Sequence, residues 1–203
     1  MKALPKLVVV IAAIAWFTAI VFGGGALLRY SATGGRSSPT PAAWPVTSKL
    51  PRDARTTMVM FAHPFCACTQ ASLAELDRLL TKTRGTATVV FLEPLNVDES
   101  WRDSRLIERA RGMQGVTVVF DDAGHEASLF GAETSGHVVV YDAGGALRYS
   151  GGITQARGHE GWSAGQESLA SILGGSASDS SKSPIYGCAL TGSQEPEFAD
   201  KGK

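Results

Sequence analysis

The chain has 203 residues, of which 44% are hydrophobic, and its 19 basic and 19 acidic side chains give a formal net charge of zero. This length and hydrophobic fraction are enough for one globular domain with a core of its own. Three of the basic residues precede residue 31, so the remainder carries 19 acidic and 16 basic side chains, a net charge of −3. We expect no nucleic-acid partner, because binding to nucleic acid requires a clustered basic surface.

An uncharged apolar stretch of 22 residues lies near the N-terminus, at residues 7–28. At about 1.5 Å per helical residue it would extend about 33 Å, close to the thickness of a bilayer's hydrocarbon core. Two lysines and the amino terminus precede it and two arginines follow, which slightly favours a cytoplasmic N-terminus. We therefore expect residues 1–30 to be a single-pass anchor in the inner membrane, with the rest on the periplasmic side. A cleaved secretory signal is the alternative, and it would export the same domain.

Two polar stretches flank the part of the chain that is expected to fold. Residues 31–50 are rich in Ser, Gly, Pro and Thr, a composition typical of a flexible linker. Residues 175–203 have a similar composition and are expected to form a flexible tail, within which the apolar residues of 184–190 form a docking segment around Cys188. The folded domain is therefore expected at residues 51–174.

Apolar runs of strand length alternate with helical patterns throughout that domain. The expected strands are 57–62, 86–95 and 116–122, followed by a hairpin over 136–152. The expected helices are 66–83, 100–113, 125–131 and 165–173. This β-α-β-α-β-α-β-β-α order predicts an α/β fold, with a mixed, mostly parallel sheet flanked by helices and an antiparallel edge.

Two of the three cysteines lie where the first strand gives way to the first helix, in "HPFCACT". Cys66 is expected at the helix N-terminus, whose unpaired N–H groups and dipole favour the thiolate. Cys68 falls within the first turn, and a disulfide between residues two apart is geometrically tight and therefore easily reduced. Three cysteines are too few for a disulfide scaffold, so redox chemistry or metal binding is expected instead.

The stretch "MFAHPFCACTQ" resembles the active-site segment of the thioredoxin superfamily. Pro64 matches the proline of that segment, Phe65 takes the aromatic position and Cys66 the position of the first cysteine. Thr69 occupies the usual position of the second cysteine, and Cys68 lies one residue earlier. The resemblance implies a thioredoxin-like fold.

A second departure concerns the loop that faces the site, because Gly136 stands after Ser135 where thioredoxin relatives usually carry a cis-proline. Together with "HPFCACT", the stretches "TSGHV", "GGITQARGHEG" and "YGCAL" are similar to motifs of RedB-type bacterial thioredoxin-like proteins. This resemblance implies a redox site at Cys66 and Cys68. The residues expected to support that site are His63, Pro64, Thr69, Ser135 and Gly136.

Two classes of function fit these residues. In an exported thiol–disulfide oxidoreductase, the Cys66 thiolate attacks a disulfide of a partner protein, and Cys68 or Cys188 resolves the mixed disulfide without a cofactor. In a metal-binding protein, His63, Cys66 and Cys68 hold a soft ion such as Cu(I). A thiol peroxidase is a weaker alternative, because it requires a threonine where His63 stands. His159 lies with its neighbouring glutamate in a polar loop that is expected to be solvated.

Cys188 is a possible third redox thiol. A Cys66–Cys68 disulfide is strained, so a third thiol that takes over the bond gives a less strained oxidised form. Apolar residues on both sides of Cys188 can anchor the tail to the domain. We therefore predict that the tail docks beside the 66–68 turn, and that oxidised protein contains a Cys66–Cys188 or Cys68–Cys188 linkage.

Overall fold

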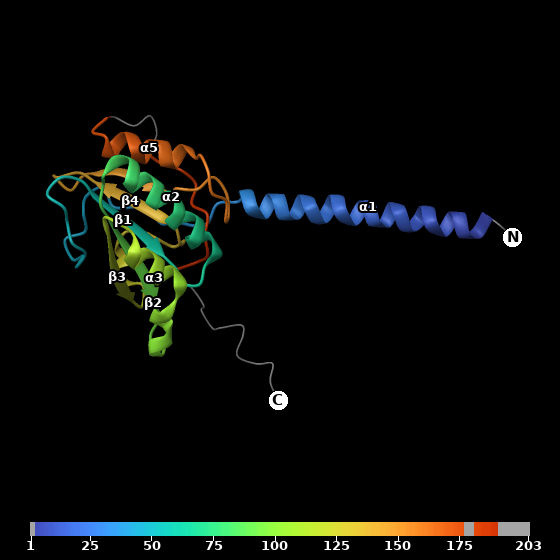
Figure 1. The fold of residues 1–203 in the computed structure, drawn as a ribbon, viewed down its shortest axis with the longest axis horizontal. Coiled ribbons are helices and arrows are strands. Elements are labelled where there is room, and N and C mark those ends of the chain that lie inside the picture. The colour runs from blue at the N-terminus through green and yellow to red at the C-terminus, as the bar shows by residue number, and fades with distance from the viewer. Residues whose placement is uncertain (1–2, 177–180, 191–203) are drawn as a thin grey trace. The chain divides into compact units, whose positions relative to one another are not determined.

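The computed structural model describes residues 3–176 and 181–190 (Figure 1). The chain divides into two compact units, residues 1–33 and residues 34–203. The first unit contains the helix α1 (Ala3–Ala32), whose stretch Leu7–Ala32 is long and apolar enough to cross a membrane. A signal sequence near the N-terminus meets the same criteria of length and apolar composition.

The second unit contains one five-stranded sheet and the helices that cover it. The strands are β1 (Thr57–Ala62), β2 (Ala87–Glu93), β3 (Val116–Asp122), β4 (His137–Tyr141) and β5 (Leu147–Gly151). The helices are α2 (Ala67–Thr83), the 3₁₀ helix η1 (Glu99–Asp103), α3 (Arg105–Gly112), α4 (His125–Leu129) and α5 (Ala164–Leu173). The strand order is β3-β2-β1-β4-β5, with β1, β2 and β3 parallel and with β4 antiparallel to both its neighbours. The predicted α/β class with a mixed sheet is therefore confirmed.

The second predicted helix is divided into η1 and α3 at Ser104. The Ser104 hydroxyl accepts a hydrogen bond from the Leu106 amide at 3.2 Å, so it caps the N-terminus of α3. The same hydroxyl donates to the carbonyl of Pro64. This buried serine therefore fixes the loop that leads from β1 into α2.

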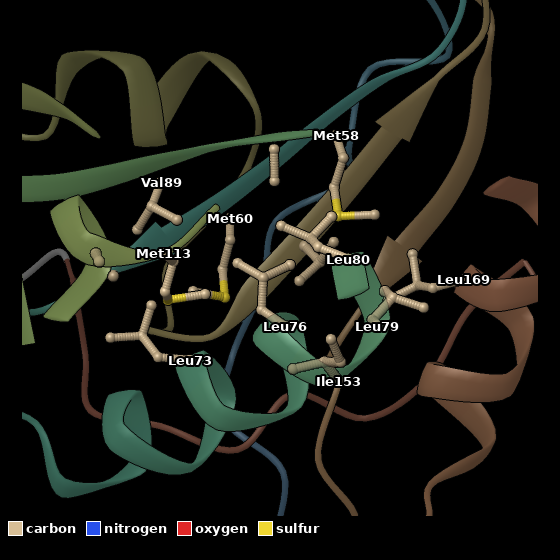
Figure 2. Close-up of a cluster of buried hydrophobic side chains, with 14 of the residues drawn as sticks. Met58, Met60, Leu73, Leu76, Leu79, Leu80, Val89, Met113, Ile153 and Leu169 are labelled. Atoms are coloured by element: carbon tan, nitrogen blue, oxygen red, sulfur yellow. The ribbon is translucent and has the colours of Figure 1, made fainter. Parts of the chain in front are cut away.

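One face of the sheet is covered by α2, α3 and α5. Alternation along β1 directs Met58 and Met60 to this face, where they pack against leucines at helical spacing in α2 (Figure 2). Ile153 and Leu169 close the cluster beside α5. This packing holds the N-terminus of α2 against the end of β1, the junction that contains Cys66.

The other face of the sheet is covered partly by residues that precede β1. Trp44 packs edge-on against Phe130 and Tyr141, with ring centroids 4.9 and 5.3 Å away. Its amide donates to the Gly145 carbonyl at 2.8 Å. Residues 34–50 lie within the range expected to be a flexible linker, but they contact the domain. Trp44 and Leu50 bury apolar side chains there, and these two residues are not apparent from the polar average composition of the stretch.

Candidate redox site

The β1–α2 junction places Cys66 at the N-cap of α2, with extended backbone angles φ −92° and ψ 123°. Its carbonyl accepts from the Thr69 amide at 3.0 Å, and its amide donates to the His63 carbonyl at 3.2 Å. The residue is only 1% exposed. The sulfur therefore lies at the positive end of a helix and beneath a cover of protein.

That cover is the C-terminal segment, which runs antiparallel to residues 133–135. The Ser135 amide donates to the Cys188 carbonyl, and the Leu190 amide donates to the Glu133 carbonyl, both at 2.8 Å. A Cβ added at Gly187 would lie 1.9 Å from the Ser135 carbonyl oxygen, so this close approach requires glycine. The segment thus pairs with the loop before β4 as a short added strand.

The three sulfurs gather where this segment crosses Cys66, and all three cysteines are free thiols in this structure. The Cys188 amide donates to the Cys66 sulfur at 3.3 Å. The side chains of Cys188 and Cys68 also interact with Cys66 closely enough to shift the pKa values of these thiols. Both neighbours can donate to a Cys66 thiolate, and neither carries a charge when it does so.

These contacts lower the pKa of one thiol, Cys66, and raise the pKa values of the other two, Cys68 and Cys188. The hydrogen bond from Cys188 is the main cause that lowers the pKa of Cys66 from 9.0 to about 5, against the opposing effect of burial. The amides of Thr69, Cys188 and Cys68 lower the same pKa further. The pKa of Cys188 is raised by its bond to Cys66 and by burial, and the pKa of Cys68 is raised by burial and by Cys66. The site therefore stabilises a single thiolate, on Cys66.

A loop between β5 and α5 contacts the other two thiols. The Gly158 amide is hydrogen-bonded to Cys68, and the positive charge of Arg157 favours the thiolates of Cys68 and Cys188. Arg157 also donates to the carbonyl of Gly187. The arginine therefore joins this loop to the C-terminal segment at the point where that segment reaches Cys66.

The buried carboxylate of Glu75 in α2 anchors the same loop. It accepts from the Gly161 amide and from the Gln166 side chain, both at 2.6 Å. Arg78 pairs with both Glu75 and Glu160, the latter at 2.5 Å. Sequence reasoning missed Glu75 and Arg157, although an acidic residue beside the apolar stripe of the 66–83 helix was a signal for the first.

The expected supporting residues lie together around Cys66. The Ser135 hydroxyl accepts from the His63 amide at 3.0 Å and lies 2.7 Å from the Thr69 hydroxyl. Thr69 in turn donates to the His63 carbonyl at 3.0 Å. Gly136 has a φ of 87°, and its amide donates to the Phe61 carbonyl at 2.7 Å. Through these bonds the loop before β4 is fastened to the β1–α2 junction.

The His63 ring lies within a small aromatic cluster. Its Nδ1 atom accepts from the Phe65 amide at 3.1 Å. Its centroid lies 5.6 Å from that of Trp101 and 6.3 Å from that of Phe65. Among residues 3–176 and 181–190, no three His, Cys, Asp or Glu side chains form a group that could hold a metal ion. This finding offers no support for the metal site considered at His63, Cys66 and Cys68.

Comparison with solved structures identifies the fold. A scan against known protein families finds no match, and neither does a search of curated proteins. An uncharacterised conserved protein from Geobacillus kaustophilus aligns with a TM-score of 0.56 and 17% identity, over 80% of this chain and 94% of its own. A hypothetical protein from Sinorhizobium meliloti aligns with a TM-score of 0.51 and 20% identity, over 79% and 94% of the two chains.

A secreted disulfide oxidoreductase of Mycobacterium tuberculosis, homologous to DsbE of E. coli, aligns with a TM-score of 0.41 and 15% identity over 60% of this chain and 82% of its own. At these identities the similarity concerns the fold alone. The predicted α/β class with a mixed sheet is confirmed by the strand order, and the Geobacillus and Sinorhizobium proteins share this fold.

Proposed function

We propose that the protein is a membrane-tethered, exported thiol–disulfide oxidoreductase of the RedB type, with α1 as an inner-membrane anchor and the domain on the periplasmic side. The observation that carries the proposal is the position of the buried Cys66 sulfur at the N-terminus of α2, where it accepts from the Cys188 amide at 3.3 Å and its pKa is lowered to about 5. A stabilised thiolate beside a second thiol is the arrangement that disulfide exchange requires. Thiol–disulfide exchange transfers two electrons directly between sulfur atoms, so the proposed reaction needs no cofactor.

Cys188 is the better partner for Cys66 in the oxidised state. Cys68 lies two residues away in the same turn, where the ~4.4–6.8 Å between Cα atoms and the near-right-angle torsion of a disulfide are hard to combine. Cys188 approaches from a separate segment, and its amide and thiol already contact the Cys66 sulfur. The proposed redox pair is therefore Cys66–Cys188, with Cys68 as a third thiol that donates to the Cys66 thiolate.

The direction of electron flow follows from the stabilised thiolate. Stabilising the Cys66 thiolate stabilises the reduced site, which makes the corresponding disulfide a stronger oxidant. The proposed reaction is the transfer of two electrons from a partner dithiol to the Cys66–Cys188 disulfide, which leaves a partner disulfide, a Cys66 thiolate and a Cys188 thiol. A disulfide-bearing protein of higher potential then returns the site to its oxidised state.

Oxidation of a dithiol peptide by the full chain in detergent micelles tests the proposal. The oxidised wild type should convert the peptide to its disulfide, and non-reducing peptide mapping should find Cys66 joined to Cys188. Cys66→Ser should abolish the reaction, whereas Cys68→Ser should retain most of it. A Cys66→Ser variant as active as the wild type would remove the basis of the proposed function.

A further inference from the structure

We infer that Cys188, rather than Cys66, is the sulfur at which the partner's thiolate attacks the oxidised site. The inference rests on the proposed Cys66–Cys188 redox pair and adds which of its two sulfur atoms the partner thiolate attacks. Cys188 would then carry the mixed disulfide with the partner, while Cys66 would remain inside the protein as the internal leaving group. The C-terminal segment would thus be the arm through which the domain exchanges electrons.

Exposure separates the two cysteine residues first. Cys66 is 1% exposed, because the C-terminal segment lies over the β1–α2 junction. Cys188 belongs to that covering segment and is itself exposed. A protein thiolate must approach a disulfide sulfur directly to displace the other sulfur, and a folded partner can do so only at Cys188 while the segment stays docked.

The nature of the leaving group favours the same sulfur. Attack at Cys188 expels Cys66, whose thiolate is held at the N-terminus of α2 by the amides of Thr69 and Cys188. Attack at Cys66 would instead expel Cys188, which lies on the covering segment and not at a helix N-terminus that could stabilise its thiolate. A thiol of lower pKa leaves faster, so the bond breaks preferentially toward Cys66.

The docked segment also accounts for the second half of the reaction. In the first step the partner thiolate bonds to Cys188, the Cys66–Cys188 bond breaks, and its electron pair remains on Cys66. In the second step the partner's second thiolate attacks the partner sulfur that is bonded to Cys188. This forms the partner disulfide and releases Cys188 as a thiolate, which takes up a proton. Hydrogen bonds to Ser135, Glu133 and Arg157 hold the segment throughout, so Cys188 returns beside Cys66.

The test determines which sulfur first carries an incoming thiol. The full chain with Cys68→Ser is oxidised in detergent micelles and checked for its Cys66–Cys188 disulfide by non-reducing peptide mapping. It is then mixed briefly with a labelled monothiol peptide and quenched in acid, and the remaining thiols are alkylated before mapping. A monothiol is used because it cannot complete the second step. The unsubstituted chain, treated alike, shows whether Cys68 alters the distribution.

The expected result is at least about tenfold more label on Cys188 than on Cys66 at the earliest time, which corresponds to about 1.4 kcal/mol between the two routes. Label predominantly on Cys66, in protein whose Cys66–Cys188 disulfide has formed, would overturn this inference and leave the proposed function intact. It would show that the segment opens to admit the partner. Failure to form the Cys66–Cys188 disulfide would overturn the inference together with the redox pair from which it proceeds.

Discussion

Gly187 is the residue at which the C-terminal segment comes closest to the rest of the domain. Because a Cβ at this position would lie 1.9 Å from the Ser135 carbonyl oxygen, Gly187→Val should displace the segment from Cys66. Cys66 should then react with a bulky maleimide at least about tenfold faster, since a weakening of 1.4 kcal/mol is already a factor of ten. The labelling rate of Cys66, with Cys68 and Cys188 replaced by serine in both proteins, measures the effect.

Gly112→Ala is the matched control for this substitution. An added Cβ at Gly112 meets no atom within 4 Å, so the labelling rate should stay at that of the parent protein. Equal rates for the Gly187→Val variant and its parent would show that the segment does not shield Cys66.

His137 gives the domain a specific dependence on pH. Burial lowers the pKa of this imidazole from 6.5 to about 4, and its Nε2 atom lies 2.8 Å from the Ser150 hydroxyl. The unfolded chain therefore takes up a proton near pH 6.5 that the folded chain accepts only near pH 4. Stability from the neutral ring is fully present above pH 6.5 and is lost as the pH falls toward 4, by at most about 3 kcal/mol at ~1.36 kcal/mol per pKa unit.

Denaturant unfolding of the wild type and of His137→Gln between pH 4 and 7 measures this contribution. Glutamine does not titrate, so the variant should lose less free energy of unfolding than the wild type as the pH falls. Parallel curves for the two proteins would mean that the ring is protonated in the folded state as readily as in the unfolded one.

At the scale of elements, the β5–α5 loop depends on α2 for its position. Glu75→Ala would leave the Gly161 amide and the Gln166 side chain without their acceptor and would remove one of the two carboxylate partners of Arg78. We expect the free energy of unfolding to fall by about 2–4 kcal/mol, as is typical when a buried charged group is removed from its partners. Amide hydrogen exchange at Gly161 should accelerate as well.

Asp77→Ala provides the comparison for Glu75→Ala within the same helix. Asp77 is exposed, so its removal should change the free energy of unfolding by no more than about 0.5 kcal/mol. If the two variants lose equal stability, the network around Glu75 does not anchor the loop.

The elements of the sheet were predictable because apolar runs of strand length and helical spacing recur clearly from Thr57 to Leu173. The sequence also placed Cys66 at a helix N-terminus. The break at Ser104 was missed although a capping serine is a local signal, and its second bond, to the Pro64 carbonyl forty residues away, could not be read from the sequence. The sequence likewise could not reveal Arg157, whose contact with Gly187 exists only once the C-terminal segment has docked.

At the scale of the whole molecule, the compact unit begins at residue 34 rather than at the first strand. A chain that begins at residue 50 lacks Trp44 and its contacts with Phe130 and Tyr141. Its free energy of unfolding should be at least about 3 kcal/mol lower than that of a chain beginning at residue 34, the usual cost of removing a buried tryptophan. Trp44→Ala in the longer chain should reproduce most of the loss, whereas equal denaturation midpoints for the two chains would show that residues 34–49 add no stability.

The titration of the Cys66 thiolate tests the central claim most directly, because the account depends on a thiolate held by the C-terminal segment. Ultraviolet absorbance of the thiolate, followed against pH in the reduced full chain, should show one thiol that titrates near pH 5. Cys188→Ala removes the thiol that is the main cause of the lowered pKa, so the midpoint should move upward toward 9.0. A wild type whose three cysteines all titrate near 9.0, or a midpoint near 5 that Cys188→Ala leaves unchanged, would contradict the account.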